Sequence, residues 1–210
     1  MAAPVFTVDN LADHAATYRA RIEQRRIAIE SRPREKRFAL AEPPPESKEF
    51  VKAMLASASL VETHIRDGMP NFFRRPSIEL TAEEDVLARA FQRALFRLGR
   101  EYIEAARDGD GDLVRAFMEE GFPVAWSERR NGETALHAAA GSRARPAIRL
   151  LVQHWPDFLI RDQQGRFASE LAYLYGEDPA MAHLLGIKER KDAIATGRDV
   201  RRRVYTYKTS

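Results

Sequence analysis

The chain of 210 residues contains no cysteine. This excludes disulfides, thiolate zinc sites and cysteine nucleophiles, and it fits a reducing compartment. No apolar run approaches the roughly 18 residues that a membrane-spanning helix needs. The N-terminal residues 1–9 lack the basic and apolar regions of a secretory signal, and the acidic residues that follow argue against a transit peptide. We therefore expect a cytoplasmic protein without membrane insertion.

Motifs of catalysis are also missing. The sequence has no phosphate-binding loop of the G-x-x-x-x-G-K-[ST] or G-x-G-x-x-G type and no G-x-S-x-G nucleophile turn. Its five histidines are scattered, with no H-x-x-x-H pair that would suggest a metal site. These absences predict a protein that is not an enzyme and that needs no cofactor.

One segment, 108–119, has the D-x-D-x-D…E pattern of a calcium loop. Its sixth position, where such a loop needs glycine for a sharp turn, is Leu113. The repeat alignment given below places residues 112–119 in a helix instead. We therefore expect no bound metal here.

The net charge of +3 conceals basic ends and an acidic middle. Segments 19–37 and 186–210 each carry eight Lys or Arg against three Asp or Glu, so the remainder carries −7. The C-terminal end also interleaves aromatic and basic side chains (Arg201, Arg202, Arg203, Tyr205 and Tyr207). Such a tail suits a nucleic-acid backbone, an acidic protein groove, or solvent alone.

Apolar residues at three- and four-residue spacings predict helices over 9–31 and 47–66. In the first, Asp9 or Asn10 is the expected N-cap, and one stripe carries the core residues Leu11, Tyr18, Ile22 and Ile29. A proline-rich linker, 32–45, separates the two helices.

A third helix is expected to begin with a capping box. Thr81 and Glu84 have the required spacing, in which the hydroxyl accepts from the Glu84 N–H and the carboxylate accepts from the Thr81 N–H. The apolar pattern that follows predicts a long helix continuing beyond residue 100.

The stretch 132–140 reads G-E-T-A-L-H-A-A-A, and a related block, G-R-F-A-S-E-L-A, follows 33 residues later at 165–172. The first block resembles the G-x-T-P-L-H-x-A-A signature of the ankyrin repeat, with Ala135 in place of the usual proline, and 33 residues is the ankyrin period. Helical segments around Val114, Ile148 and Met181 continue the spacing at 34 and 33 residues.

The resemblance covers 98–190 and implies three repeats, the last one degenerate. For this part it implies a short solenoid at 98–191. With the helices predicted before it and the basic end after it, we expect an all-α fold: an N-terminal helical extension at 1–97, which packs on the repeats because three are near the minimum for a stable stack, the solenoid, and a basic tail at 192–210. The resemblance also implies that His137 is structural, binding backbone in the neighbouring turn.

Ankyrin repeats bind partners through turn tips and inner helices. The resemblance therefore implies a non-enzymatic interaction module or adaptor with a basic binding face and an acidic protein partner. The candidate binding residues are Trp126, Arg129, Arg130, Glu133, Arg161, Gln163 and Arg166. Two alternatives remain open: a nucleic-acid-associated protein that binds through its basic ends, and a structural subunit of a larger assembly.

Overall fold

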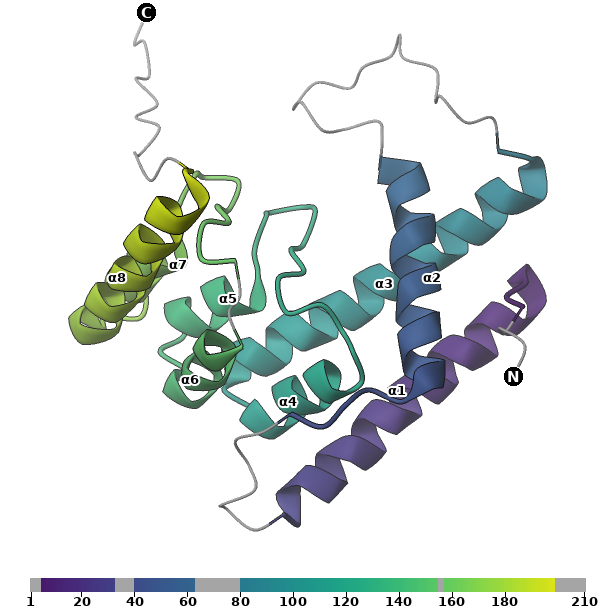
Figure 1. Ribbon diagram of the computed structural model, residues 1–210, viewed down its shortest axis with the longest axis horizontal. Coiled ribbons are helices and arrows are strands. Elements are labelled where there is room, and N and C mark those ends of the chain that lie inside the picture. Colours follow the sequence, from purple (N-terminus) through teal and green to yellow (C-terminus); the bar gives the residue numbers. More distant parts are fainter. Residues whose placement is uncertain (1–4, 33–39, 63–79, 155–156, 199–210) are drawn as a thin grey trace, which may run out of the picture. The chain divides into compact units, whose positions relative to one another are not determined.

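The computed structural model shows a helical protein (Figure 1). It describes residues 5–32, 40–62, 80–154 and 157–198. Within these ranges there are eight helices and no strand, and one isolated antiparallel bridge pairs Ser127 with Thr134. The prediction of an all-α chain is confirmed at this level. In the same ranges, no helix has the length and apolarity needed to cross a bilayer.

The chain divides into two compact units. The first contains residues 1–100 and 115–122, and the second contains 101–114 and 123–210. The division passes through two helices, α3 (Ala82–Asp108) and α4 (Gly111–Glu119). The boundaries expected from the sequence, after residues 97 and 191, stay predictions.

The first unit begins with α1 (Val8–Glu30), which is capped by Thr7. The Thr7 Oγ1 accepts from the backbone N–H of Asn10 at 3.4 Å, and the Asn10 Oδ1 accepts from the Thr7 N–H at 2.9 Å. The expected N-cap at Asp9 or Asn10 is therefore wrong. Asn10 is instead the third residue of the helix and closes the reciprocal pair of a capping box.

The core of this unit is aromatic. Phe50 of α2 (Pro45–Glu62) lies with its ring centroid 5.2 Å from Tyr18 and 6.2 Å from Phe91 of α3. Phe6 meets Phe50 and Phe91 edge-on, a geometry that aromatic pairs favour. The predicted α1 stripe is confirmed, since its four apolar residues are the buried ones of that helix. In Figure 1, α2 runs across the direction of α1.

The predicted start of α3 is also confirmed. The Thr81 backbone N–H donates to a Glu84 carboxylate oxygen at 2.8 Å, and the Glu84 N–H donates to the Thr81 Oγ1 at 3.3 Å. The two side chains satisfy backbone donors that have no partner within the helix.

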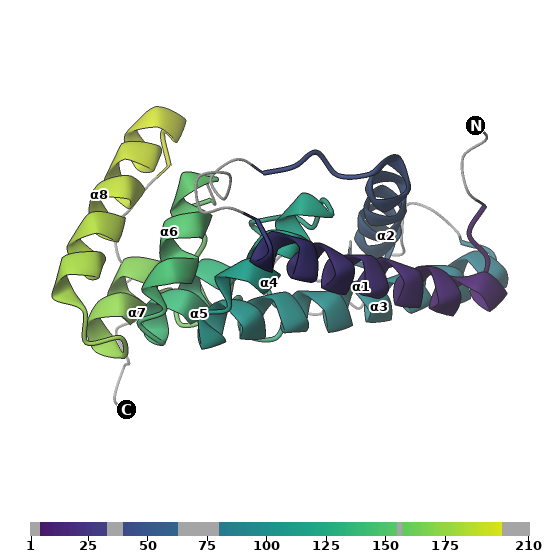
Figure 2. The same cartoon turned by 90° about the horizontal axis from the view of Figure 1, so that it is seen from below.

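The second unit contains two helix pairs, α5 (Ala135–Gly141) with α6 (Arg145–Gln153) and α7 (Ala168–Leu174) with α8 (Pro179–Thr196). The start of α7 follows the start of α5 by the same interval that separates the two sequence blocks, and α8 follows α6 by one position more. The short helices α5 and α7 form one layer and α6 and α8 form another (Figure 2). The same supersecondary unit is thus used twice in succession.

The turn that leads from one helix to the next repeats as well. Left-handed backbone occurs at Gly109 (φ 77°), Arg143 (φ 57°) and Glu177 (φ 47°), which are equally spaced along the chain. This conformation costs free energy for residues other than glycine, so Arg143 and Glu177 hold it because the helix pairing on either side requires the turn.

Helices α5 and α7 approach closely because small residues face one another. Ala139, Ala140 and Ala172 are almost completely buried. A Cβ added to Gly176 would collide with the carbonyl oxygen of Ala140. The contact between successive helix pairs therefore depends on the absence of a side chain at this position.

Candidate interaction surface

The turn between α4 and α5 is a small hairpin. Beside the bridge of Ser127 and Thr134, the Glu128 N–H donates to the Glu133 carbonyl at 2.7 Å. The Asn131 Oδ1 accepts from the Glu133 N–H at 2.9 Å, and Gly132 supplies the left-handed residue (φ 69°). Arg129, Arg130 and Asn131 are exposed at its tip.

The next turn, between α6 and α7, is organised by a buried carboxylate. The Asp162 Oδ1 accepts from the backbone N–H groups of Gln164 at 2.9 Å and Arg166 at 2.8 Å. Its Oδ2 accepts from the Arg166 Nε at 2.7 Å. Asp162 therefore fixes both the backbone of this turn and the guanidinium group of Arg166.

The two turns are joined by hydrogen bonds. The Gln163 N–H donates to the Asn131 carbonyl at 2.8 Å, from one tip to the other. A Cβ at Gly132 would lie 3.0 Å from that donor nitrogen, so the approach favours glycine. The tips of successive turns are thus held together by backbone.

His137 makes the second connection, as the resemblance implied. Its Nε2 lies 3.2 Å from the Arg166 carbonyl, which can only accept, so this nitrogen carries the proton. Its Nδ1 accepts from the Thr134 hydroxyl at 2.8 Å. Burial lowers the pKa of His137, which favours the neutral ring that this arrangement requires.

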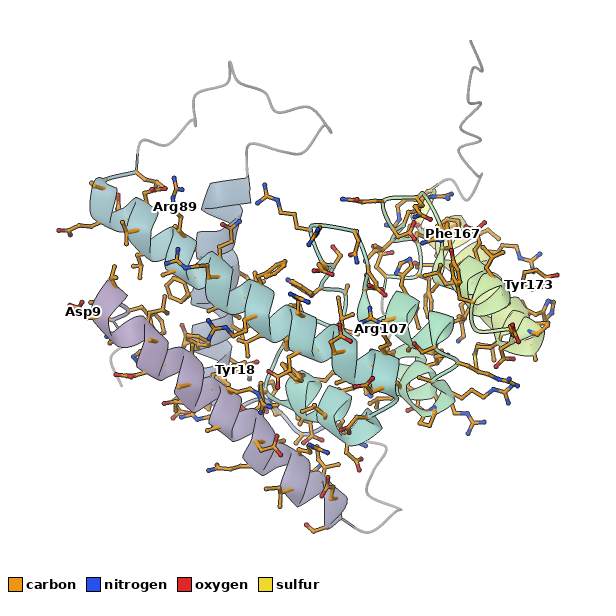
Figure 3. The ribbon with its side chains drawn as sticks, turned by 180° about the vertical axis from the view of Figure 1, so that it is seen from behind. Asp9, Tyr18, Arg89, Arg107, Phe167 and Tyr173 are labelled. Carbon is orange, nitrogen blue, oxygen red and sulfur yellow. The ribbon has the colours of Figure 1, made fainter. Side chains whose placement is uncertain are left out.

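Two of the candidate arginines form contacts with other residues of the second unit. The Arg161 guanidinium carbon lies 3.7 Å from the Phe167 ring centroid, and its Nη1 donates to the Gly165 carbonyl at 2.6 Å. Arg166 binds Asp162 and also donates to the Tyr175 hydroxyl at 2.9 Å. Figure 3 places Phe167 at the turn side of the α7–α8 pair. Both arginines therefore build the turn rather than a free basic face.

The remaining candidates differ in their exposure. Glu133 is half-buried, and both of its carboxylate oxygens accept from Arg107 (labelled in Figure 3) at 2.9 Å. Trp126 is also half-buried. Gln163 is exposed, and its Nε2 donates to the Arg129 carbonyl at 3.4 Å.

Arg129 and Arg130 complete the set. Both are exposed, and neither forms an ion pair with any residue in the described ranges. Of the four arginines expected to make the turn face basic, these two present their charge to solvent. The candidate site therefore narrows to the tip of the first hairpin and the adjoining Gln163.

The described part of the N-terminal basic segment pairs with acidic residues of the first unit. Five of its eight basic residues form ion pairs with glutamates (Arg19, Arg21, Arg25, Arg26 and Arg32). The other three, and the basic tail with Arg201, Arg202, Arg203, Tyr205 and Tyr207, lie outside the described residues.

The acceptors of two of these arginines are buried at the end of α4. Arg32 binds both carboxylate oxygens of Glu119 at 2.8 and 3.0 Å. Arg25 donates to the Glu120 Oε1 at 2.9 Å, and the Ser47 hydroxyl donates to Oε2 at 2.5 Å. The network joins α1, α2 and the end of α4.

The electrostatics of Glu119 follow from its surroundings. Burial by itself would raise the pKa of its carboxyl, but hydrogen bonds from Arg32 and Arg115 outweigh burial and lower that pKa. Arg115 is the (i, i+4) partner on α4 and is itself buried. That spacing is the one signal in the sequence that could have indicated part of this network.

The calcium-like segment has a helical role. The Asp110 Oδ1 accepts from the Leu113 N–H at 2.9 Å at the start of α4, and Glu119 is bound by arginines. In the part of the chain that the structure describes, no cluster of three or more metal-binding side chains occurs. The expected helix over 112–119 is confirmed.

Comparison with known proteins identifies no family for this chain. No protein-family model and no curated protein sequence matches it.

Proposed function

We propose that this chain is a non-enzymatic protein-interaction module with ankyrin-like repeats, which binds an acidic segment of a partner protein through a turn tip. The single observation that carries the proposal is a rigidly held tip with uncompensated positive charge. Arg129 and Arg130 are exposed on a hairpin whose Asn131 carbonyl accepts from Gln163 of the next turn. Two adjacent guanidinium groups on a preorganised backbone suit carboxylates, because each can bind one bidentately.

The assignment to ankyrin-like repeats is supported by three regularities. The helix pairs recur with the period of the two sequence blocks. A left-handed residue recurs at the turn between successive helices. His137 donates to the carbonyl of Arg166 in the following turn. Because neighbouring repeats share these contacts, the stack holds successive turn tips at a fixed spacing.

The charges of the described residues favour a protein partner over nucleic acid. The N-terminal basic segment, one of the two ends expected to bind a phosphate backbone, has five of its arginines in ion pairs with glutamates. Nucleic-acid binding would then rest on the tail and on Arg34, Lys36 and Arg37, which lie outside the described residues. A gel shift at low ionic strength separates the two, because phosphate binding weakens steeply with salt.

The proposal is tested by reversing the charge of the tip. The double variant Arg129→Glu/Arg130→Glu should no longer capture the acidic proteins that the wild-type chain captures from a nuclease-treated native lysate. The matched control is Arg93→Glu/Arg97→Glu, which changes the net charge equally at two exposed arginines of α3. Capture that is unchanged in the tip variant, or lost equally in both, would remove the tip from consideration.

A further inference from the structure

The last helix of the second unit has more than one apolar face. With 18 residues, α8 is twice the length of α6, which has nine. One face is directed inward, with buried residues at every fourth position (Met181, Leu185, Glu189 and Ala193). Glu189 on this face accepts from the Ser169 N–H at 3.0 Å and from its hydroxyl at 2.6 Å. This face is accounted for by packing within the unit.

A second face follows a different spacing. Its residues recur at intervals of four and three (Ala180, Leu184, Ile187, Lys191 and Ile194). Leu184 is 43% exposed and Ile194 is 84% exposed. A four–three apolar spacing places side chains along one seam and is the pattern by which two helices pack together. On the outer side of a surface helix, polar residues are expected at these positions.

The end of the neighbouring helix α7 is similarly apolar. When the two sequence blocks are aligned, Tyr173 occupies the position of Ala140 in the preceding pair; Ala140 is 1% exposed, whereas Tyr173 is 64% exposed. Figure 3 shows Tyr173 at the outer edge of the α7–α8 pair. A terminal repeat ordinarily presents a polar outer face to solvent. Here the end of α7 retains large exposed apolar side chains, as surfaces that bind other molecules often do.

The charges along α8 define the chemistry of that molecule. The exposed charged residues of this helix, Arg190 and Lys191, are both basic. Its two acidic residues are used internally, Glu189 as described and Asp192 in an ion pair with Arg198 at 3.5 Å. A second copy whose α8 packed in parallel would bring Lys191 and Arg190 against the same residues of its partner, and like charges disfavour that pairing.

We propose that the four–three face of α8 binds an amphipathic helix of a partner protein whose apolar stripe is flanked by Asp and Glu. The apolar stripe packs on Leu184, Ile187 and Ile194, and the acidic flanks pair with Arg190 and Lys191. The methylene stem of Lys191 covers apolar surface while its ammonium group reaches the acidic flank. This surface is separate from the hairpin tip with Arg129 and Arg130.

The experiment measures binding of two designed peptides to the full chain by fluorescence anisotropy. Each peptide has about 21 residues, or three heptads, with leucine at four–three spacing. One carries glutamate at the flanking positions and the other carries lysine. The glutamate peptide should bind at least about tenfold more tightly than the lysine peptide. Equal affinity, or no binding of the glutamate peptide, overturns the proposal.

Variants then locate the binding. Leu184→Glu and Ile194→Glu should each lower the affinity for the glutamate peptide by about tenfold or more. The matched control Ile27→Glu changes an apolar residue that is 60% exposed on α1 and should bind as the wild type does. Sedimentation of the unmodified chain completes the test: a dimer that Leu184→Glu dissociates would assign this face to a second copy and overturn the proposal. The Arg129→Glu/Arg130→Glu variant should bind the glutamate peptide as the wild type does. The proposal for the hairpin tip and the proposal for α8 can therefore fail separately.

Discussion

The guanidinium group of Arg32 binds both oxygens of the Glu119 carboxylate, 87 residues further along the chain. The Glu119 side chain is fully buried, and Arg115 also donates to it at 3.0 Å. A buried carboxylate of this kind is stable only while its charged partners remain. The pair therefore attaches the segment after α1 to the end of α4 within the first unit.

Glu119→Gln should lower the free energy of unfolding by about 3 kcal/mol, because it removes the charge of the buried carboxylate that Arg115 and Arg32 bind. Urea denaturation followed by circular dichroism measures the change. The control is Glu42→Gln, whose partner Lys48 and carboxylate are both exposed, and which should unfold as the wild type does. Equal stability of the two variants would show that the buried network contributes nothing.

His137 predicts a dependence of stability on pH. Burial lowers its pKa in the folded chain, so the neutral ring favours folding above the unfolded value of about 6.5. That contribution is lost as the pH falls from 6.5 through the folded pKa, since the ring must then become charged in a buried site. Between pH 7.5 and 5.5, thermal unfolding of the wild type should shift to lower temperature.

The variant His137→Gln removes this titration and should show a smaller shift over the same pH range. His183→Gln serves as the control, because His183 is exposed on α8; it should follow the wild type. A wild-type melting temperature that is constant from pH 7.5 to 5.5 would contradict the assigned role of His137.

Local patterns could be predicted from the sequence because their causes are local. The Thr81–Glu84 capping box and the buried stripe of α1 depend on residues within one or a few helical turns, and both are confirmed. The role of His137 was also correctly expected, from the block around it. The N-cap of α1 was misplaced because Thr7 lies before the apolar stripe on which the prediction relied.

Pairings between distant residues could not be predicted. Periodicity carries no information that Arg32 meets Glu119 or that Arg25 meets Glu120, because each of these arginines lies in another helix or connecting segment. The binding site predicted from the sequence included too many residues for a related reason. Arg161 and Arg166 were expected on a free basic face, but Phe167 and Asp162 lie close enough in the turn to hold them. The geometry therefore leaves Arg129 and Arg130 as the exposed charges at the tip.

The close contact between successive helix pairs can be tested with two glycines of the second unit. Gly176→Ala should lower the free energy of unfolding by about 2–3 kcal/mol, because the new Cβ meets the carbonyl oxygens of Ala140 and Ala172 and forces α5 and α7 apart. Gly186→Ala makes the same chemical change within α8, where nothing lies within 4 Å of the new Cβ. It should instead raise stability by about 0.5–1 kcal/mol, since alanine is the better helix former. Chemical denaturation of both variants measures the difference in sign, and a stable Gly176→Ala protein would contradict the close approach of the two helices.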